Sequence, residues 1–253
     1  MDFNLVLPPR TRNWQTPISK TAGTHTINVG HGVDELHIRL WSGGGAGASM
    51  TGPKGLNTSG GGSGGYCGAF IPVKYGDKVE IIVGGSAGAS YIKRIRDNVT
   101  KTLVTITPGS GGRTAGTLTT VGGGAGGVAT VNDTDIVIKA LKLTGNTGGS
   151  CPGGNAPKSG GSGGNSVGAI FGTALQEGEE QYKPYTGGAG GAGGSPSGWN
   201  CSEGGAGGGG GAGYFSGSAG RHGNGCNSSG GAGGAGYAII EYRAIGSDSI
   251  SIS

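Results

Sequence analysis

The sequence predicts a mostly β and irregular fold with essentially no α-helix, in which short antiparallel strands lead into a sandwich of polyglycine-II helices. Three observations predict this fold. Glycine makes up 65 of the 253 residues, parts of the glycine-rich tracts repeat Gly-Gly-Ala every three residues, and strand-like segments run directly into tracts. A period of three matches an extended left-handed helix with three residues per turn, whereas side chains in a strand alternate every two residues.

The glycine-rich tracts recur along most of the chain. The period of three is clearest in residues 187–194 and 230–236. A helix of this type has no internal hydrogen bonds, so its N–H and C=O groups must pair with adjacent helices. With only 10 prolines and a broken three-residue register, the chain does not fit collagen. The other tracts are residues 42–48, 59–65, 84–88, 108–112, 122–127, 145–154, 159–164, 203–213 and 216–220.

Alternating apolar and polar residues predict the strands. We expect a hairpin over residues 67–83, turning at Tyr75-Gly76-Asp77, and a second strand pair around Asp97-Asn98. We also expect a short sheet at one end of the molecule, with backbone hydrogen bonds taking the place of a large apolar core. The expected strands are residues 24–29, 36–42, 67–74, 78–83, 90–96, 102–107, 135–143 and 237–243.

The ends of the chain differ from its middle. Residues 1–20 are an arm with three prolines, residues 21–243 are the glycine-rich β and polyglycine-II domain, and residues 244–253 are a polar tail. The arm is either loose or a segment that anchors the protein to a partner through Phe3, Leu5 and Trp14. The tail is either loose or paired at a sheet edge.

The composition argues against several classes of protein. A net charge of +4 and credible strands argue against a disordered chain, although Leu, Ile, Val and Phe make up under a fifth of it. Lys93, Arg94 and Arg96 form the basic cluster, which fits a strand surface better than a nucleic-acid site. No apolar run is long enough to span a membrane as a helix, and the N-terminus lacks a secretory signal pattern.

The residues also give no pattern for catalysis or metal binding. The four cysteines have no C-x-x-C spacing, so free thiols are the default and a Cys201–Cys226 disulfide is the minor alternative. The four histidines cluster neither with cysteines nor with a nucleophile motif. The acidic residues Glu177, Glu179 and Glu180 fit a solvated loop better than a hydrolase site. We therefore expect no enzyme, cofactor or metal.

Three segments within residues 22–243 combine a strand with a glycine-rich tract, namely DELHIRLWSGGGAGA, YGDKVEIIVGGSAGA and GGAGGAGYAIIEY. In these segments the sequence resembles the glycine-rich domain of bacteriophage tail-fibre and receptor-binding proteins. The architecture is also similar to the polyglycine-II adhesins that cap the long tail fibres of T-even-type phages, although residues 1–20 do not match their attachment domain. The resemblance implies a virion protein at the tail-fibre tip, made in the host cytoplasm. The partners that it implies are a tail-fibre protein, expected as a trimer, and a bacterial outer-membrane protein or lipopolysaccharide.

The segments between the tracts supply the candidate receptor-binding residues, because aromatic and charged side chains concentrate there. The alternative for Tyr185, Tyr214 and Phe215 is that they close the ends of the helix stack. Since successive tracts reverse direction, residues 195–202 and 221–228 should share one end, with Tyr214 and Phe215 at the other. The candidates are Tyr182, Tyr185, Trp199, Asn200, Tyr214, Phe215, Arg221, His222 and Asn227.

The function that we expect is therefore adhesion to a bacterial receptor by loops on a glycine-rich scaffold. Two alternatives remain open: a structural virion protein without receptor contact, and an ice-binding polyglycine-II protein.

Overall fold

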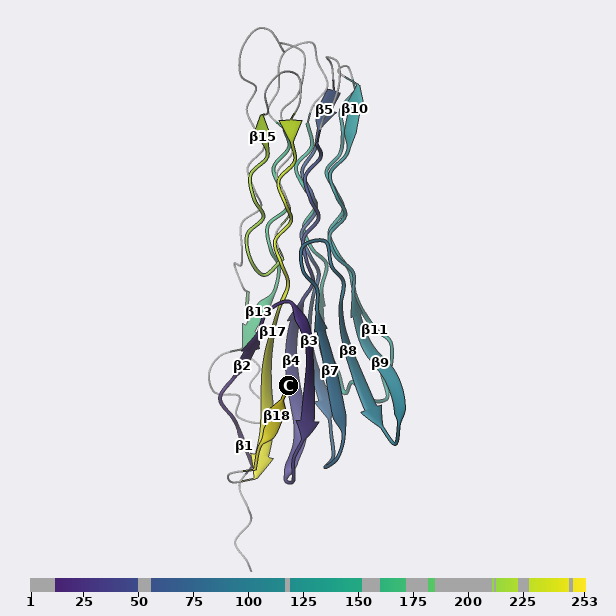
Figure 1. Ribbon diagram of the computed structural model, residues 1–253, viewed down its shortest axis with the longest axis vertical. Helices are drawn as coiled ribbons and strands as arrows, with labels where there is room; N and C mark the ends of the chain where they lie inside the picture. Colours follow the sequence, from purple (N-terminus) through teal and green to yellow (C-terminus); the bar gives the residue numbers. More distant parts are fainter. Residues whose placement is uncertain are drawn as a thin grey trace, which may run out of the picture.

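The computed structural model describes residues 12–49, 56–116, 119–151, 160–171, 182–184, 211, 213–222, 228–245 and 248–253. Within these ranges the protein consists mostly of antiparallel β-sheets and has no helix. The molecule is elongated, with two large sheets at one end and wavy glycine tracts running from them to the other end (Figure 1). We call the two sheets together the sandwich.

Sheet A has the strand order β1-β17-β4-β6-β12, and β2 also pairs with β17. Every pairing in this sheet is antiparallel. Strand β17, near the C-terminus, pairs with β4, and Tyr237 lies opposite Trp41. The strands of sheet A are β1 (Arg12–Trp14), β2 (Ile18–Lys20), β4 (Val33–Trp41), β6 (Tyr66–Pro72), β12 (Lys139–Leu143) and β17 (Tyr237–Ile245).

Sheet B has the order β11-β9-β8-β7-β3-β18, again antiparallel throughout. The β8–β9 pair turns at Asp97 and Asn98, which both have positive φ angles of 51° and 60°. This confirms the strand pair predicted around these two residues. The strands of sheet B are β3 (Gly23–Val29), β7 (Lys78–Val83), β8 (Ser90–Arg96), β9 (Val99–Ile106), β11 (Ala129–Val131) and β18 (Ile250–Ile252).

The predicted hairpin over residues 67–83 is wrong, because β6 belongs to sheet A and β7 to sheet B. The turn at Tyr75 carries the chain from one sheet to the other, as does the turn between β3 and β4. Both strands bury apolar residues on the face toward the other sheet, so crossing between sheets buries more apolar surface than pairing side by side.

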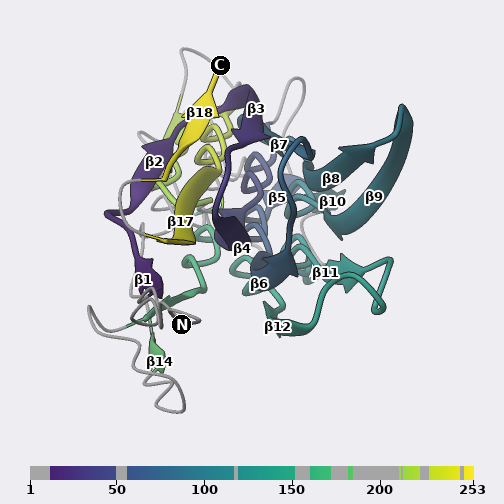
Figure 2. The same cartoon turned by 90° about the horizontal axis from the view of Figure 1, so that it is seen from below.

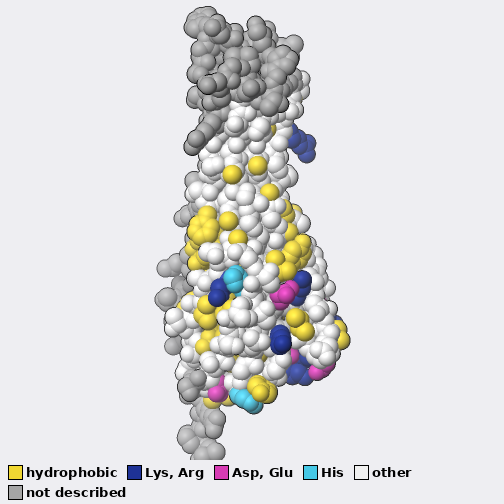
Figure 3. Space-filling model, viewed as in Figure 1, with side chains coloured by type: hydrophobic (Ala, Val, Ile, Leu, Met, Phe, Trp, Pro, Cys, Tyr) yellow, Lys and Arg dark blue, Asp and Glu magenta, His cyan; other side chains and the backbone are white. Residues whose placement is uncertain are grey.

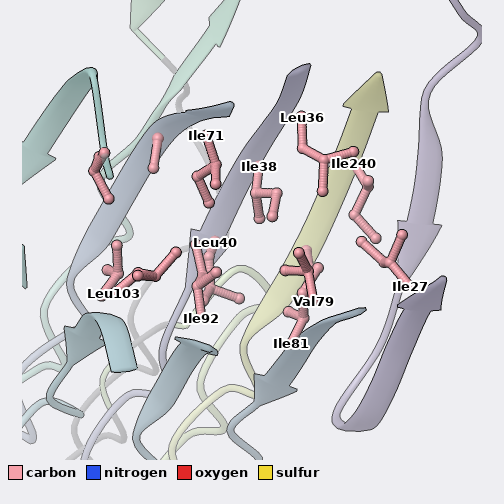
Figure 4. Close-up of a cluster of buried hydrophobic side chains, with 14 of the residues drawn as sticks. Ile27, Leu36, Ile38, Leu40, Ile71, Val79, Ile81, Ile92, Leu103 and Ile240 are labelled. Atoms are coloured by element: carbon pink, nitrogen blue, oxygen red, sulfur yellow. The ribbon is translucent and has the colours of Figure 1, made fainter. Parts of the chain in front are cut away.

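An apolar core fills the space between the two sheets. Ile38 and Ile240 from sheet A and Ile81 from sheet B are fully buried within it (Figure 4). We expected backbone hydrogen bonds to replace such a core, and for the sandwich this expectation is wrong. The few large aliphatic residues are concentrated in these strands, at one end of the molecule. Their alternation along each strand places them on the inner faces of the two sheets, where they pack against one another.

Three further outcomes concern the chain ends and β12. Residues 135–138 precede β12 instead of belonging to it, and 134–136 form a turn. The arm contributes β1 and β2, which both pair with β17. The tail pairs at a sheet edge, as one of the two alternatives proposed, because β18 lies beside β3.

The glycine tracts are held together by backbone hydrogen bonds that recur at every third residue. A pleated strand would instead repeat its pairing every second residue. Between residues 42–48 and 59–65 the donors and acceptors are Ser42 N–H to Gly65 O, Gly45 N–H to Gly62 O and Ala48 N–H to Ser59 O, at 2.8–3.1 Å.

Residues 57–65 form the centre of this part of the protein, and every one of them is buried. Their backbone exchanges hydrogen bonds with tracts on several sides, namely residues 42–48, 108–113, 122–127, 145–149 and 160–164. Because each neighbour is bonded through its backbone, this end of the protein has an interior made of peptide groups. We call these hydrogen-bonded tracts the glycine bundle.

Burial in the glycine bundle also repeats every three residues. In the last tract Ser228, Gly231 and Gly234 are buried, whereas Ser229 and Ala232 are exposed. From β17 onward the buried positions repeat every two residues, as at Ala238 and Ile240. The period therefore changes from three to two where the tract enters the sheet.

Serine hydroxyls complete the pairing at tract ends. Ser42 Oγ accepts the Gly65 N–H at 2.9 Å and donates to the Thr107 carbonyl oxygen at 2.7 Å. Ser63 Oγ accepts the Asn146 N–H at 2.7 Å. These hydroxyls satisfy backbone groups that no adjacent tract reaches, which a buried peptide group requires.

Candidate recognition surface

Two short strand pairs mark the far end of the glycine bundle, opposite the sandwich (Figure 1). One pair is β5 (Leu56–Thr58) with β10 (Thr114–Gly116), and the other is β15 (Arg221–His222) with β16 (Ser228–Ser229). Each pair ties together the two chain segments that lead into and out of this end. The far end of the bundle is therefore tied together by backbone pairing of β5 with β10 and of β15 with β16.

The β5–β10 pair is anchored below the surface. Asn57 is 3% exposed, and its Nδ2 donates to the Thr119 carbonyl oxygen at 3.0 Å. Ser59 Oγ accepts the Arg113 N–H at 2.8 Å, which fixes the start of β10 against the central tract. Arg113 itself is exposed. The far end thus has buried, hydrogen-bonded polar side chains and the exposed side chain of Arg113 beside them.

Two candidate receptor-binding residues, Arg221 and His222, lie in β15 at the far end. They pair with Ser229 and Ser228 of β16. The structure thus places residue 221 and the Tyr214–Phe215 turn at opposite ends of the bundle, as the alternation of tract direction predicted.

Tyr214 and Phe215 lie at the junction between the glycine bundle and the sandwich. The Tyr214 ring stacks on Tyr237, with ring centroids 4.2 Å apart, and meets Trp41 edge-on at 4.9 Å. Phe215 packs edge-on against Tyr237 at 5.4 Å and is 45% exposed. Tyr214 therefore closes the end of the stack, which was the alternative to receptor contact, while Phe215 is largely open to solvent.

Tyr182 lies in β14 (Tyr182–Pro184), which pairs with β13 (Ala169–Phe171). The segment leading into β13 runs along the outer side of sheet A, where Trp41 Nε1 donates to the Val167 carbonyl oxygen at 2.7 Å. Figure 1 shows β13 near β2 and β17, and Figure 2 shows β14 on the side of the sandwich where β1 lies. Tyr182 is therefore far from Arg221 and His222, and the two do not belong to one surface.

Trp14, a candidate for attachment to a fibre, packs against the protein's own sheet A. Its ring meets Phe70 at 6.1 Å and His37 at 6.3 Å, both nearly perpendicular. The candidates Phe3, Leu5, Tyr185, Trp199, Asn200 and Asn227 lie outside the described residues.

The outer face of sheet A holds a buried charged group that sequence reasoning missed. Glu241 accepts from His37 Nδ1 at 2.9 Å and from Arg39 Nη2 at 3.1 Å, and both partners are nearly inaccessible to solvent. Burial tends to raise the pKa of Glu241, but the hydrogen bond from His37 and the charges of Arg39 and His37 outweigh it and lower that pKa. The sequence does indicate that His37 and Arg39 share one face of the strand, because they alternate with Leu36, Ile38 and Leu40.

The basic cluster predicted for a strand surface lies in β8, and neighbouring carboxylates neutralise much of it. Lys93 pairs with Glu80 at 3.0 Å. Arg96 donates to both carboxylate oxygens of Asp77. Charged side chains in the view of Figure 3 gather over the sandwich, while the bundle is nearly free of them.

His25, His31 and His37 are engaged in structural contacts. His25 Nε2 lies 2.9 Å from the Thr21 carbonyl oxygen, His37 pairs with Glu241, and His31 stacks on Tyr75. Cys67 and Cys151 are buried free thiols. In the described ranges no group of three His, Cys, Asp or Glu residues is arranged to hold a metal ion, and no helix has the length and apolarity to cross a membrane.

An antiparallel sandwich continued by a glycine bundle defines a glycine-rich β-protein. The chain belongs to the glycine-rich domain family, whose model matches residues 19–243. No curated protein matches the sequence significantly.

Proposed function

We propose that this protein is a phage tail-fibre tip adhesin, and that its tracts are polyglycine-II helices packed into a rigid scaffold. Loops at the far end would contact an outer-membrane protein or lipopolysaccharide on the bacterial surface. The resemblance of the sequence to tail-fibre and receptor-binding domains suggests the viral setting, and family membership is consistent with it.

Several observations support the helical type of the tracts. Hydrogen bonds and burial both repeat every three residues, which is the period of a polyglycine-II helix. Seen end-on, the described tracts wind about parallel axes side by side (Figure 2). Close packing of this kind requires glycine, because a Cβ atom on Gly109 would lie 2.0 Å from the Gly62 carbonyl oxygen.

The observation that carries the proposal is the buried central tract, which begins at β5 at the far end. Loops rooted in such a scaffold lose little conformational entropy on binding, so they can form a specific surface. Arg221 and His222 are the described candidates at this end, and Arg is common among residues that dominate interfaces. Several copies on one particle would turn modest single-site affinity into stable adsorption.

The mechanism is recognition by contact, with no covalent step and no cofactor. A tail-fibre protein would carry the adhesin, and the receptor would be on the host. The contributions of Tyr182, Tyr185, Trp199, Asn200 and Asn227 remain predictions. Tyr214 contributes by packing the junction, because its ring stacks on Tyr237 and meets Trp41 edge-on.

The test replaces residues 223–227 with those of a relative of different host range, while keeping the β15–β16 pairs intact. The matched control replaces Lys78 and Thr102, which are exposed on sheet B, with alanine. Binding of purified protein to whole cells and inhibition of phage adsorption are measured. We expect the loop exchange to weaken binding to the original host by about tenfold or more, as loss of a dominant contact does, and the control to bind normally.

Other outcomes would decide against the proposal. Absence of cell binding by the unmodified protein would favour a structural virion protein. Thermal hysteresis in its solutions would favour an ice-binding protein. An unchanged host preference after exchange would remove residues 223–227 from the receptor contact.

A further inference from the structure

A stacked pair of exposed rings lies on the base, which we define as the turns at residues 30–34, 73–77 and 97–98 at the end of the sandwich opposite the bundle. The His31 and Tyr75 rings are 3.5 Å apart between centroids and inclined by 15°. Tyr75 is 62% exposed, and Val99, next to the third turn, is 59% exposed. Large apolar side chains thus face solvent at turn tips, although the core between the sheets is well filled.

The turns that carry these rings are fixed by hydrogen bonds. Asp77, which is 1% exposed, accepts the Lys74 N–H at 3.1 Å through Oδ2 and the Arg96 Nε–H at 2.6 Å through Oδ1. Val29 N–H donates to the Asp77 carbonyl oxygen at 3.0 Å, and Gly76 N–H donates to Val29 O at 3.2 Å. The rings therefore stand on a preorganised platform, and little freedom would be lost when a partner covers them.

The charges around the rings are mixed in sign. Lys74 and Asp97 are exposed in the same turns, and Asp248 lies against Gly32. An apolar aromatic centre with a rim of both charges is the usual composition of a protein–protein contact. An anionic glycan or lipid headgroup would be matched by a basic surface instead.

We propose that the base, centred on His31 and Tyr75, is the face by which this protein docks onto the protein that carries it on the particle. This proposal rests on the proposed function, because recognition at the far end leaves the opposite end for attachment. The partner would offer an apolar pocket for the Tyr75 ring, with polar groups around it. The base also replaces Trp14 as the candidate attachment site, since Trp14 packs on Phe70 and His37.

The experiment compares particles assembled with the unmodified chain, with a His31→Ala/Tyr75→Ala double variant, with Tyr75→Phe, and with Val128→Ala as the control. Val128 is 47% exposed beside the bundle and away from the base, so its truncation removes exposed apolar surface elsewhere. Copies per particle are counted by quantitative mass spectrometry. The melting temperature, oligomeric state and whole-cell binding of each purified protein are measured in parallel.

We expect the double variant to be incorporated about tenfold less or worse, with an unchanged melting temperature and unchanged cell binding. Tyr75→Phe and Val128→Ala should be incorporated normally. Normal incorporation of a folded double variant overturns the proposal. Loss of cell binding with normal incorporation would mean that the base faces the host, and a shift from dimer to monomer with normal incorporation would mean that it binds a second copy.

If the unmodified chain is itself missing from purified particles, the proposed function fails and this proposal fails with it. If the unmodified chain is present and binds cells but its incorporation ignores the base, only the docking proposal fails.

Discussion

Gly62 and Ala125 approach each other so closely that a Cβ atom on Gly62 would lie 2.0 Å from the Ala125 carbonyl oxygen. No real Cβ contact is that short, so the two backbones can be neighbours only because residue 62 has no side chain. The Gly62 carbonyl oxygen also accepts a hydrogen bond from the Gly45 N–H, and the Gly62 N–H donates to the Ser110 carbonyl oxygen. The position is therefore enclosed by peptide groups of several tracts.

Replacing Gly62 with alanine should destabilise the protein by about 3 kcal/mol, because the buried tracts must move apart to admit a methyl group. Gly122→Ala is the matched control, since a Cβ atom there meets nothing within 4 Å and its position is exposed. That variant should be neutral or more stable by about 0.5 kcal/mol. Chemical denaturation of both proteins measures the difference, and equal stabilities would contradict the close packing.

Ser42→Ala should cost about 1–3 kcal/mol, because it leaves the buried Gly65 N–H without its acceptor. Ser218 has a similar role at an exposed position, where its Oγ accepts the Ala232 N–H at 2.7 Å. Water can replace that hydroxyl, so Ser218→Ala should cost clearly less. Thermal unfolding of the two variants compares them, and a larger loss for Ser218→Ala would show that burial does not set the cost.

Asp77 should make the protein less stable in acid. Burial tends to raise the pKa of this carboxyl, but the hydrogen bonds from Arg96 and Lys74 and the nearby arginine charges lower it below its ordinary value. The unfolded chain therefore binds a proton at a higher pH than the folded chain does. The stabilisation is present above the unfolded pKa of about 3.9 and is lost as pH falls through the folded pKa.

Asp77→Asn should accordingly lower the free energy of unfolding by about 1–3 kcal/mol at pH 7, since it removes charged hydrogen bonds. The gap between the variant and the unmodified protein should shrink below pH 4, which urea titrations at several pH values would measure. A gap that is constant with pH would assign the loss to packing alone.

Cys67 should be unreactive in the folded protein. Burial raises the pKa of its thiol to about 12, against a smaller opposing effect of Lys142, so at pH 8 only about one thiol in ten thousand is ionised. Native protein treated with a thiol reagent should leave Cys67 unlabelled, and unfolded protein should label it. Peptide mass spectrometry reads both states, and rapid native labelling would show that β6 opens.

The sequence predicts much of the fold because two periodicities are visible in it. The alternation in residues such as Leu36, Ile38 and Leu40 predicts strands. The Gly-Gly-Ala repeat around Gly231 and Gly234 anticipates the three-residue burial. Sheet membership could not be predicted, because the turn at Tyr75 is compatible with a hairpin or with a crossing between sheets. The choice depends on apolar faces that meet only in the folded protein.

The candidate site was predicted less well. Tract reversal correctly separates residue 221 from Tyr214, since that inference needs only the chain direction. The place of Tyr182 beside the sandwich depends on a contact between Trp41 and Val167, residues far apart in sequence. The burial of His37 and Arg39 beside Glu241 was missed because burial on the outer face of sheet A depends on the segments that cover it.

The change of burial period at Gly234, after which Gly236 and Ala238 are buried, constrains how the gene can vary in length. Adding or deleting one residue within 228–236 would turn every later position by a third of a revolution and bring Ser229 or Ala232 toward neighbouring backbones. A whole triplet would preserve the phase and lengthen the shaft. Insertions and deletions tolerated in related bundles should therefore come in multiples of three residues, so that the length of the bundle can evolve while its cross-section stays constant.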